Sequence, residues 1–339
     1  MRLYAPPTDQ PGSAADSQVG VVIPVYNRKA TLLETLPFVV EQTCPPSKLV
    51  IVDDGSTDGT PAAVEGWLAR RRPGFVWKVI RARHATAAAA RNVGFDEVRS
   101  LPFVAFLDSD DHWPLDFLAR ASATLAARRD AVAAVADRRF FDAFGEEVDG
   151  DDCRGLVANP INWFFQHGAG VASCSIFRTD AIEAAGGWDT SFDAAEDSVL
   201  FCDLALRGAW VHIPGVAVRF NVGSAWARCE EHNLSQRHVD SHRRWALVFE
   251  SIFARICKSN PTVARGEFHK ALAMRWYWAG KQLFEQGRAD EARDCFRRAV
   301  TWQPTMFRAW RRLASTRTKL WYKSAAPLEG DDAQKRAAG

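Results

Sequence analysis

The sequence predicts an α/β protein, a mostly parallel sheet flanked by helices, followed by an α-helical extension. Short apolar runs recur between helical patterns, and they are continuous rather than alternating, as in strands buried on both faces of a parallel sheet. From about residue 241 only helical periodicity remains. We therefore expect two domains, 19–240 and 241–323, between a disordered lead (1–18) and a disordered tail (324–339).

Four apolar runs supply the expected strands of the first domain: Val19–Val25, Leu49–Val52, Phe75–Ile80 and Phe103–Leu107. The helices expected between them lie at about 28–43, 61–72 and 87–99. The second of these should begin with Thr60 as its N-cap, because Pro61 suits the first helical position. This alternation predicts a doubly wound sheet, to which Ser173–Phe177 adds a further strand.

Composition narrows the class of protein. Among 339 residues, 47% are hydrophobic and 25% are charged, as in soluble globular proteins and unlike disordered, fibrous or integral membrane proteins. The net charge of +2 argues against a protein that coats nucleic acid. This near-neutrality is an average, because residues 1–240 carry a net charge of −9 and residues 241–339 carry +11.

The cysteines and the hydropathy of the sequence indicate the cellular compartment of the protein. The seven cysteines stand singly without a Cys-x-x-Cys pair, which predicts reduced thiols rather than a zinc cage or a disulfide framework. The first twenty residues lack the apolar core of a signal peptide, and no apolar run reaches the length of a membrane span. We expect a cytoplasmic protein.

Polar residues follow three of the apolar runs. They are Tyr26-Asn27-Arg28, Asp53-Asp54-Gly55-Ser56 and Asp108-Ser109-Asp110-Asp111. Ligands of open α/β sheets bind at the carboxyl ends of the strands, so these residues are candidates for a binding site. Asn, Asp, Gly and Ser are common in turns, so turn formation alone explains any one of these three segments. It does not explain why all three strand ends carry such residues.

Two acidic groups each allow two interpretations. Asp108–Asp111 offers the hard oxygen ligands that Mg²⁺ or Mn²⁺ prefers, and such a metal would act as a Lewis acid on a leaving diphosphate. The same acids could instead cap a helix near Pro114. Glu196 and Asp197 either include a general base, with a pKa raised by burial, or cap a helix that begins near Ser198.

Four linked motifs carry a family resemblance. The strings Val21–Arg28, Val50–Thr60, Ala90-Arg91-Asn92-Val93-Gly94 and Phe106–Asp111 stand in the order and spacing of family 2 glycosyltransferases, whose fold is GT-A. The resemblance continues through Gly186-Gly187-Trp188-Asp189 to Glu196-Asp197 and covers about residues 19–230.

This resemblance implies a nucleotide site, a metal and a base. It implies that Asp54 meets the nucleotide base, typically uracil, and that Asp108 approaches the ribose. Asp110 would bind Mn²⁺ or Mg²⁺, and Asp197 would deprotonate the acceptor hydroxyl, with Glu196 as the alternative working acid. The nucleotide-binding residues implied are Pro24, Tyr26, Asn27, Asp54, Arg91, Asp108 and Ser109.

The sequence also departs from the family pattern. Ala85 and Thr86 stand where glycines are usual, and the segment from Asp111 to Pro114 is one residue short. Asn221 stands where relatives often place a histidine that joins the metal. Three histidines remain as candidates for that role, each also explained as a solvated or structural side chain: His212, His232 and His238.

The extension resembles one tetratricopeptide unit, from Trp276 to Pro304, followed by the start of a second. Gly280 and Ala292 would let two helices approach closely, with Gly287-Arg288 as their turn. Because one and a half repeats do not make a free solenoid, we expect a packed appendage. The basic, tryptophan-containing stretch 301–325 either contacts an anionic membrane surface or packs its tryptophans inward.

The resulting hypothesis is an inverting, non-processive glycosyltransferase. It would move a sugar from a nucleotide-diphospho-sugar, a UDP-sugar by expectation, to a saccharide, lipid-linked or protein acceptor of the bacterial cell envelope, without nucleic acid. An inactive scaffold that recruits partners through its helical tail is the alternative, although Asp110 and Asp197 are both present. A nucleotidyltransferase would need a glycine-rich triphosphate loop, and Pro24–Lys29 contains no glycine.

Overall fold

The computed structural model describes residues 18–83, 85–142, 144–192, 195–221 and 240–316. Contacts between residues divide the chain into two units, Met1–Asn233 and Leu234–Gly339. The tail expected at 324–339, and the expected lead apart from Gln18, lie outside the described residues.

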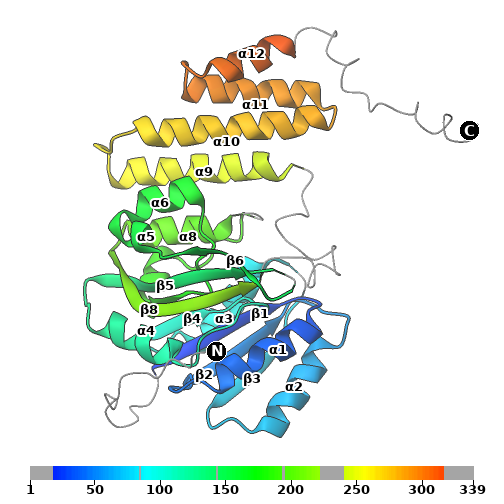
Figure 1. Ribbon diagram of the computed structural model, residues 1–339, viewed down its shortest axis with the longest axis vertical. Helices are drawn as coiled ribbons and strands as arrows, with labels where there is room; N and C mark the ends of the chain where they lie inside the picture. Colours follow the sequence, from blue (N-terminus) through cyan, green and yellow to red (C-terminus); the bar gives the residue numbers. More distant parts are fainter. Residues whose placement is uncertain (1–17, 84, 143, 193–194, 222–239, 317–339) are drawn as a thin grey trace, which may run out of the picture. The chain divides into compact units, whose positions relative to one another are not determined.

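Among the described residues of the first unit, eight strands form one mixed sheet (Figure 1). Its order is β3-β2-β1-β4-β7-β5-β6, and β8 also pairs with β5. Strands β1 to β4 are mutually parallel, β7 is antiparallel to both β4 and β5, and β8 is parallel to β5. The strands are β1 (Val19–Val25), β2 (Lys48–Asp53), β3 (Val76–Arg81), β4 (Phe103–Phe106), β5 (Ala131–Phe141), β6 (Glu147–Asp151), β7 (Ser175–Arg178) and β8 (Ala209–Asn221).

Helices connect these strands and pack on the sheet. They are α1 (Lys29–Val40), α2 (Thr60–Arg71), α3 (Ala87–Val98), α4 (Phe117–Ala126), α5 (Arg154–Ala158), α6 (Pro160–His167), α7 (Thr179–Ala185) and α8 (Glu196–Ala205). Helix α3 packs on β1 and β2, whereas α4 packs on β5, β7 and β8. The predicted α/β sheet flanked by helices is confirmed. Because β1, β2, β4, β5 and β8 run in the same direction, their carboxyl ends share one edge of the sheet.

Two expectations about local structure are wrong. The strand at Val76–Arg81 is not buried on both faces: it lies at the edge of the sheet order, its exposure alternates, and Val76 is 61% exposed. The N-cap of α2 is Gly59, in the left-handed conformation with φ +81°, and Thr60 is already helical. Asp58 supplies the capping interaction instead, since its Oδ1 accepts a hydrogen bond from the Thr60 N–H at 2.9 Å.

The second unit contains four described helices. They are α9 (Ser241–Ser259), α10 (Gly266–Glu285), α11 (Ala289–Trp302) and α12 (Phe307–Ser315), and consecutive helices pack on one another (Figure 1). A Cβ on Gly280 would lie 2.6 Å from the buried ring of Phe296, so α10 and α11 approach as closely as the sequence predicts. Gly287, with φ +79°, makes the turn between them. None of the described helices has the length and hydropathy needed to cross a membrane.

Gly94 tests the packing of α3 on the sheet. A Cβ at Gly94 would lie 2.3 Å from Cγ1 of Val22 on β1, and both residues are buried. We expect Gly94→Ala to lower the free energy of unfolding by about 1–3 kcal/mol, because the overpacking exceeds the gain in helix propensity. Urea denaturation measures the change.

Gly66 in α2 is the matched control. The nearest atom to its added Cβ is the flexible Nη1 of Arg70 at 3.4 Å. Gly66→Ala should therefore stabilise the unit by about 0.5–1 kcal/mol. Equal stabilisation by the two substitutions would contradict close packing at Gly94.

Candidate functional site

Backbone and side-chain hydrogen bonds join the loops that follow β1 and β2. The N–H of Asn27, a residue with φ +51°, donates to Oγ of Ser56 at 2.8 Å, and Oδ1 of Asn27 accepts from the N–H of Thr57 at 2.7 Å. Pro24 pairs with Val52 inside the sheet, just before this junction. The first loop predicted to surround a ligand is thus fastened to the second.

Asp54 lies buried at the end of β2, with 6% of its surface exposed. Its N–H donates to the carbonyl of Val25 at 2.8 Å, and its Oδ1 accepts from the N–H of Ala85 at 2.9 Å. Ala85 is one of the two residues that replace the usual glycines, and its backbone still reaches the acid. The preceding residue, Asp53, has a buried Oδ1 that finds no hydrogen-bond partner among the described residues, so this strand end retains an unused acceptor there.

Arg91 of α3 joins the acids of two distant segments. Its guanidinium donates to Oδ1 of Asp108 at 2.8 Å and to Oε1 of Glu196 at 3.1 Å, and it stacks on the ring of Trp188 at 4.5 Å. Only 7% of Arg91 is exposed. Burial raises the pKa of Glu196, as does neighbouring Asp197, while Arg91 opposes the shift. Arg91 is therefore the counter-ion that lets two acids face the same edge of the sheet.

A second arginine neutralises the next acid along the chain. Arg28, after β1, forms an ion pair with Oδ2 of Asp110. Burial raises the pKa of Asp110; Arg28 opposes the rise and Asp108 adds to it. Burial also raises the pKa of Asp111 well above its usual range, and Asp110 and Asp108 reinforce that shift. Ionisation of all the carboxylates at this strand end is therefore unfavourable, and a cation beside them offsets that cost.

The capping interpretation of Asp108–Asp111 is wrong. Helix α4 begins only at Phe117, with Asp116 as its N-cap residue. Among the residues that the structure describes, no three His, Cys, Asp or Glu side chains gather as a metal cluster. A single carboxylate, Asp110, still fits Mg²⁺ or Mn²⁺ held jointly with diphosphate oxygens and water, because such ions take few protein ligands.

Asn221, at the end of β8, reaches the acidic segment through an amide. Its Nδ2 donates to the carbonyl of Asp110 at 2.5 Å, and its Oδ1 accepts from Nε of Arg219 at 2.9 Å. The residue at the expected histidine position thus holds the backbone of Asp110. His212 instead bonds Asp137 at 2.6 Å, while His232 and His238 lie outside the described residues.

Glu196 and Asp197 open α8 and have different partners. Both lie in its first turn, because the helix begins at Glu196, two residues earlier than the start expected at about Ser198. Oδ1 of Asp197 accepts from the N–H of Ser198 at 2.7 Å, and its Oδ2 accepts from the N–H of Gly170 at 3.1 Å. Capping does not account for Glu196, whose carboxylate binds Arg91.

The structure thus brings the sequence-predicted residues to one edge of the sheet. Tyr26 and Asn27 follow β1, Asp54 follows β2, and Ser109 lies in the loop after β4, where its carbonyl accepts a hydrogen bond from Thr35 at 3.0 Å. The sequence reasoning named Arg28 among the strand-end candidates but gave it no partner. It missed Ser173, whose Oγ accepts from the N–H of Asp108, and the contact of Trp188 with Arg91. Trp188 had a signal, since it belongs to the Gly-Gly-Trp-Asp string, but Ser173 had none.

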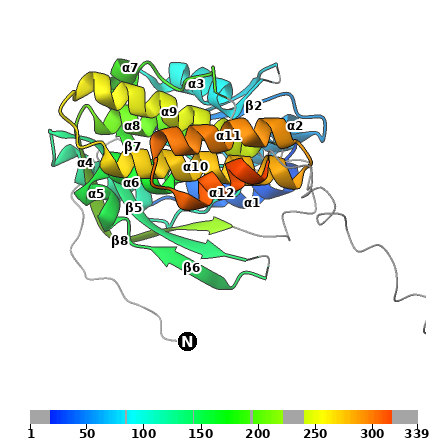
Figure 2. The same cartoon turned by 90° about the horizontal axis from the view of Figure 1, so that it is seen from above.

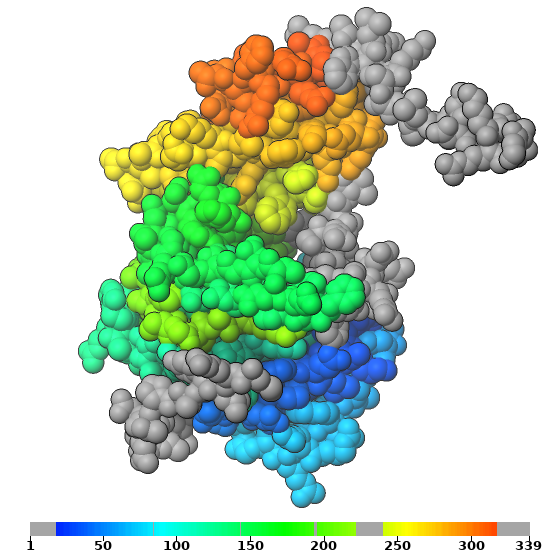
Figure 3. Space-filling model, viewed as in Figure 1, coloured from blue at the N-terminus to red at the C-terminus, as the bar shows by residue number. Residues whose placement is uncertain are grey.

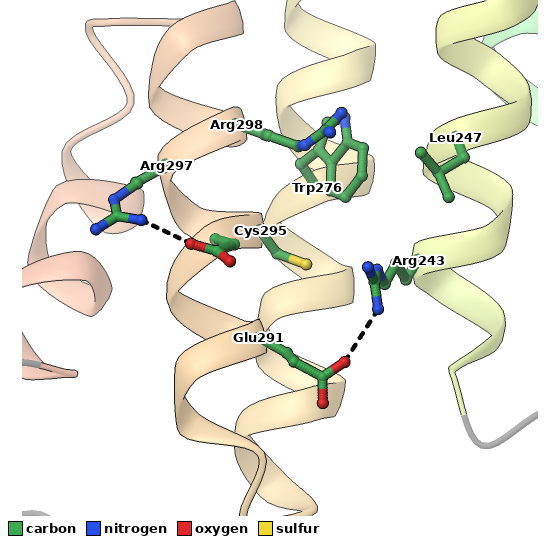
Figure 4. A pocket seen from close by; sticks show the side chains of 8 residues that line it. Arg243, Leu247, Trp276, Glu291, Cys295, Arg297 and Arg298 are labelled. Atoms are coloured by element: carbon green, nitrogen blue, oxygen red, sulfur yellow. Dashed lines mark hydrogen bonds and ion pairs between the residues drawn. The ribbon is translucent and has the colours of Figure 1, made fainter.

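A pocket of about 330 Å³ lies elsewhere, within the second unit (Figure 4). Its charged side chains form ion pairs with one another: Arg243 pairs with Glu291 at 3.0 Å, and Arg297 pairs with Asp294 at 2.6 Å. Burial raises the pKa of Cys295 in its wall to about 11, so that thiol stays protonated at neutral pH.

A sheet of this topology with acids at the ends of β2 and β4 defines an α/β domain whose candidate site lies at the carboxyl ends of its strands. Residues 20–185 match the model of the family described as glycosyl transferase family 2. The first unit belongs to this family, as the sequence motifs predict.

Curated relatives match parts of the chain. TuaG of Bacillus subtilis (strain 168) is 35% identical over 100 residues, which are 30% of this chain and 38% of TuaG. The succinoglycan biosynthesis protein ExoW of Rhizobium meliloti (strain 1021) is 29% identical over 211 residues, 56% of this chain and 64% of ExoW. The chain thus spans less than two thirds of either relative.

Solved structures share the fold. The crystal structure of S. aureus TarS 1-349 in complex with UDP-GlcNAc has a TM-score of 0.64 at 17% identity, covering 92% of this chain and 93% of that one. The mannosyltransferase PcManGT from Pyrobaculum calidifontis, in complex with GDP-Man and Mn²⁺, has a TM-score of 0.54 at 22% identity, covering 91% and 81%. At these identities, the likeness concerns the fold.

Arg91 provides a test of the charge balance. We expect Arg91→Met to lower the free energy of unfolding by about 3 kcal/mol at neutral pH, because it leaves the Glu196 carboxylate, with a side chain only 17% exposed, without its cation. The pKa of Glu196 is already raised by burial, and it rises further without Arg91. A carboxyl with a raised folded-state pKa destabilises once it is ionised, so the deficit should grow from pH 5 to pH 8.

Denaturation of both proteins at the two pH values measures this difference. Arg128→Met is the control, since Arg128 and its partner Asp130 are largely exposed, and it should change stability little at either pH. A deficit of Arg91→Met that is constant with pH would show that Glu196 is not the group responsible.

Proposed function

We propose that the protein is an inverting glycosyltransferase that moves a sugar from a nucleotide-diphospho-sugar to an acceptor hydroxyl in bacterial surface polysaccharide synthesis. The observation that carries this proposal is the bridge from Arg91 to Asp108 and Glu196, because it joins the acid proposed for the donor side to the neighbour of the proposed base. Family membership and relatives such as ExoW, named for succinoglycan biosynthesis, support it.

The donor side is built from the ends of β1, β2 and β4. Asp54 is the candidate partner of the nucleotide base, Asp108 of the ribose, and Arg91 lies between the donor-side and acceptor-side acids. The match to TarS, which was solved with UDP-GlcNAc, favours a UDP-sugar. PcManGT, however, was solved with GDP-Man, so the two matched structures hold different nucleotides. The panel of nucleotide sugars described below distinguishes uracil from guanine as the base.

Asp110 is the candidate ligand for Mn²⁺ or Mg²⁺. When bound, the metal would neutralise charge on the leaving diphosphate. In this structure the guanidinium of Arg28 is the positive charge beside the Asp110 carboxylate. Asn221 holds the backbone of Asp110 in place. The match to a mannosyltransferase structure with Mn²⁺ supports a divalent ion.

Asp197 is the candidate general base for the acceptor hydroxyl. Each of its oxygens accepts one backbone N–H, which fixes the carboxylate plane and leaves lone pairs for an acceptor. Glu196 is engaged by Arg91 and is less able to take a proton from an acceptor. Inversion requires one base opposite the leaving group, and a single oriented carboxylate meets that need.

A panel of nucleotide sugars tests the proposal. UDP-, GDP-, dTDP- and CMP-sugars are added with and without Mn²⁺, and thermal shift and slow sugar release are followed. We expect one nucleotide class to raise the melting temperature, and Mn²⁺ to increase the shift. Absence of any shift would count heavily against a transferase.

Two substitutions, each with a comparison variant, assign the acids in the same panel. Asp197→Asn should keep nucleotide binding and abolish transfer. Glu196→Gln, the same kind of change at the neighbouring acid, is the comparison and should abolish transfer only if Glu196 is the base. Asp110→Asn should remove the effect of Mn²⁺, whereas Asp116→Asn, at an exposed ion pair nearby in the sequence, should not. Retained transfer in Asp197→Asn would refute the base assignment.

We also propose that the basic stretch 301–325 contacts an anionic lipid surface. Its described part, 301–316, includes α12, which carries Phe307 at 73% exposed and Trp310 at 48% exposed, with Arg311 also exposed (α12 is the orange-red helix of Figure 3). Trp302 instead points inward, donating from Nε1 to Glu250 at 2.7 Å. Exposed aromatic and cationic residues on one helix suit the interface of a negatively charged bilayer.

Flotation with vesicles measures this contact. At low salt the protein should float with phosphatidylglycerol-containing vesicles, and not with neutral phosphatidylcholine vesicles. Phe307→Ser with Trp310→Ser should reduce flotation several-fold, because the exposed aromatic area is lost. Equal recovery with both vesicle types, or none with either, would contradict the proposal.

A further inference from the structure

A short glycine turn lies against the start of α8. In this turn, Gly168 and Gly170 both have positive φ, of 77° and 66°. The N–H of Ala169 donates to Oγ of Ser198 at 3.1 Å, and the N–H of Gly170 donates to Oδ2 of Asp197 at 3.1 Å. Two successive N–H groups thus hold the first turn of α8, and one of them holds the candidate base.

Arg138 of β5 fixes the other side of Gly170. Its Nη1 donates to the Gly170 carbonyl at 3.0 Å, and its guanidinium forms an ion pair with Asp151 of β6. The guanidinium also lies over the rings of Phe140 and Trp163, at 5.3 and 5.2 Å. The Arg138 side chain is only 13% exposed, so it has little freedom. Strands β5 and β6, which carry this arginine and its partner, lie side by side in Figure 2.

We propose that Arg138 is a positioning residue for the candidate base: by holding the Gly170 carbonyl, it keeps the Gly170 N–H aimed at Asp197. The expected effect on sugar transfer rests on the proposed function, whereas the chain of contacts from Arg138 through Gly170 to Asp197 does not. Arg138 does not touch Asp197 itself; it acts through one glycine.

Glycine makes this contact necessary. Gly170 has no side chain to restrict its backbone, and residues of this kind lose more conformational freedom on ordering than any other. A hydrogen bond from such a flexible turn orients a carboxylate only if the turn is itself held. Arg138 supplies a charge-assisted bond for that purpose. Small displacements of a catalytic group lower rates strongly, since about 1 Å can cost about 100-fold.

The first experiment needs no substrate. The full chain is labelled with [1-¹³C]alanine and [¹⁵N]glycine, which selects glycines preceded by alanine: Gly170, Gly186, Gly280 and Gly339. Gly170→Ala identifies the signal that belongs to Gly170. We expect Arg138→Met to increase exchange of the Gly170 N–H with solvent at least tenfold, and Arg138→Lys to restore part of the protection.

Arg178→Met is the matched control. Arg178 is likewise a half-buried arginine that donates to backbone carbonyls, of Leu125 and Ala131, and stacks on Phe103 at 5.6 Å. Among the described residues, the hydrogen bonds of Arg178 go to the carbonyls of Leu125, Arg128 and Ala131, and not to Gly170 or Asp197. Its substitution should lower the melting temperature without changing exchange at Gly170.

The second experiment uses the donor that the panel identifies. Arg138→Met should lower kcat about tenfold with the KM of the donor unchanged, and Arg138→Lys should recover part of kcat. Arg178→Met should leave kcat unchanged. Should Arg138→Met fail to fold, Asp151→Asn, which releases the guanidinium from its ion pair, should move exchange and kcat in the same direction.

The outcomes separate the two proposals. Unchanged exchange at Gly170 in Arg138→Met, or equal changes in Arg178→Met, would overturn the positioning role and leave the transferase proposal intact. Faster exchange in a protein that binds no nucleotide sugar would overturn the transferase proposal and leave the contact established. A rise in donor KM without a fall in kcat would likewise contradict the role of Arg138.

Discussion

The burial of the Arg91 guanidinium is the constraint on which the rest of the site depends. A buried arginine needs acceptors for its charge, and Arg91 finds them on two segments far apart in the sequence, at Asp108 and Glu196. Trp188 covers the guanidinium. The side-chain amide of Asn92 holds the Trp188 backbone: its Nδ2 donates to the Trp188 carbonyl at 2.8 Å, and its Oδ1 accepts from the Trp188 N–H at 2.9 Å. One helix, α3, therefore fixes the distance between the strand-end acids and the start of α8.

Charge balance explains why so many acids can share one edge of the sheet. Arg28 pairs with Asp110, Arg91 pairs with Asp108 and Glu196, and burial raises the pKa of Asp111, which favours its neutral form. Each acid that remains ionised thus has a cation or backbone donors close by. A divalent ion and a diphosphate would enter together as a nearly neutral pair. Their binding would therefore leave the net charge of this edge of the sheet almost unchanged.

Much of this arrangement could be predicted from the sequence, because strand ends and motif spacing are local properties. Continuous apolar runs located β1, β2 and β4, and the residues following them proved to meet at one edge. Thr60 was misassigned because Asp58, two residues earlier, makes the capping bond. The exposure of β3 depends on its place at the edge of the sheet order, which no local pattern records.

Residues that act through the backbone of another segment lay beyond sequence reasoning. Ser173 binds the N–H of Asp108, Asn221 binds the carbonyl of Asp110, and Arg138 binds the carbonyl of Gly170. Each contact joins segments separated by more than thirty residues, and none requires a particular partner side chain. Since a backbone group is present at every residue, such contacts leave no signature in spacing. The orientation of the acids is therefore decided by residues outside the recognisable motifs.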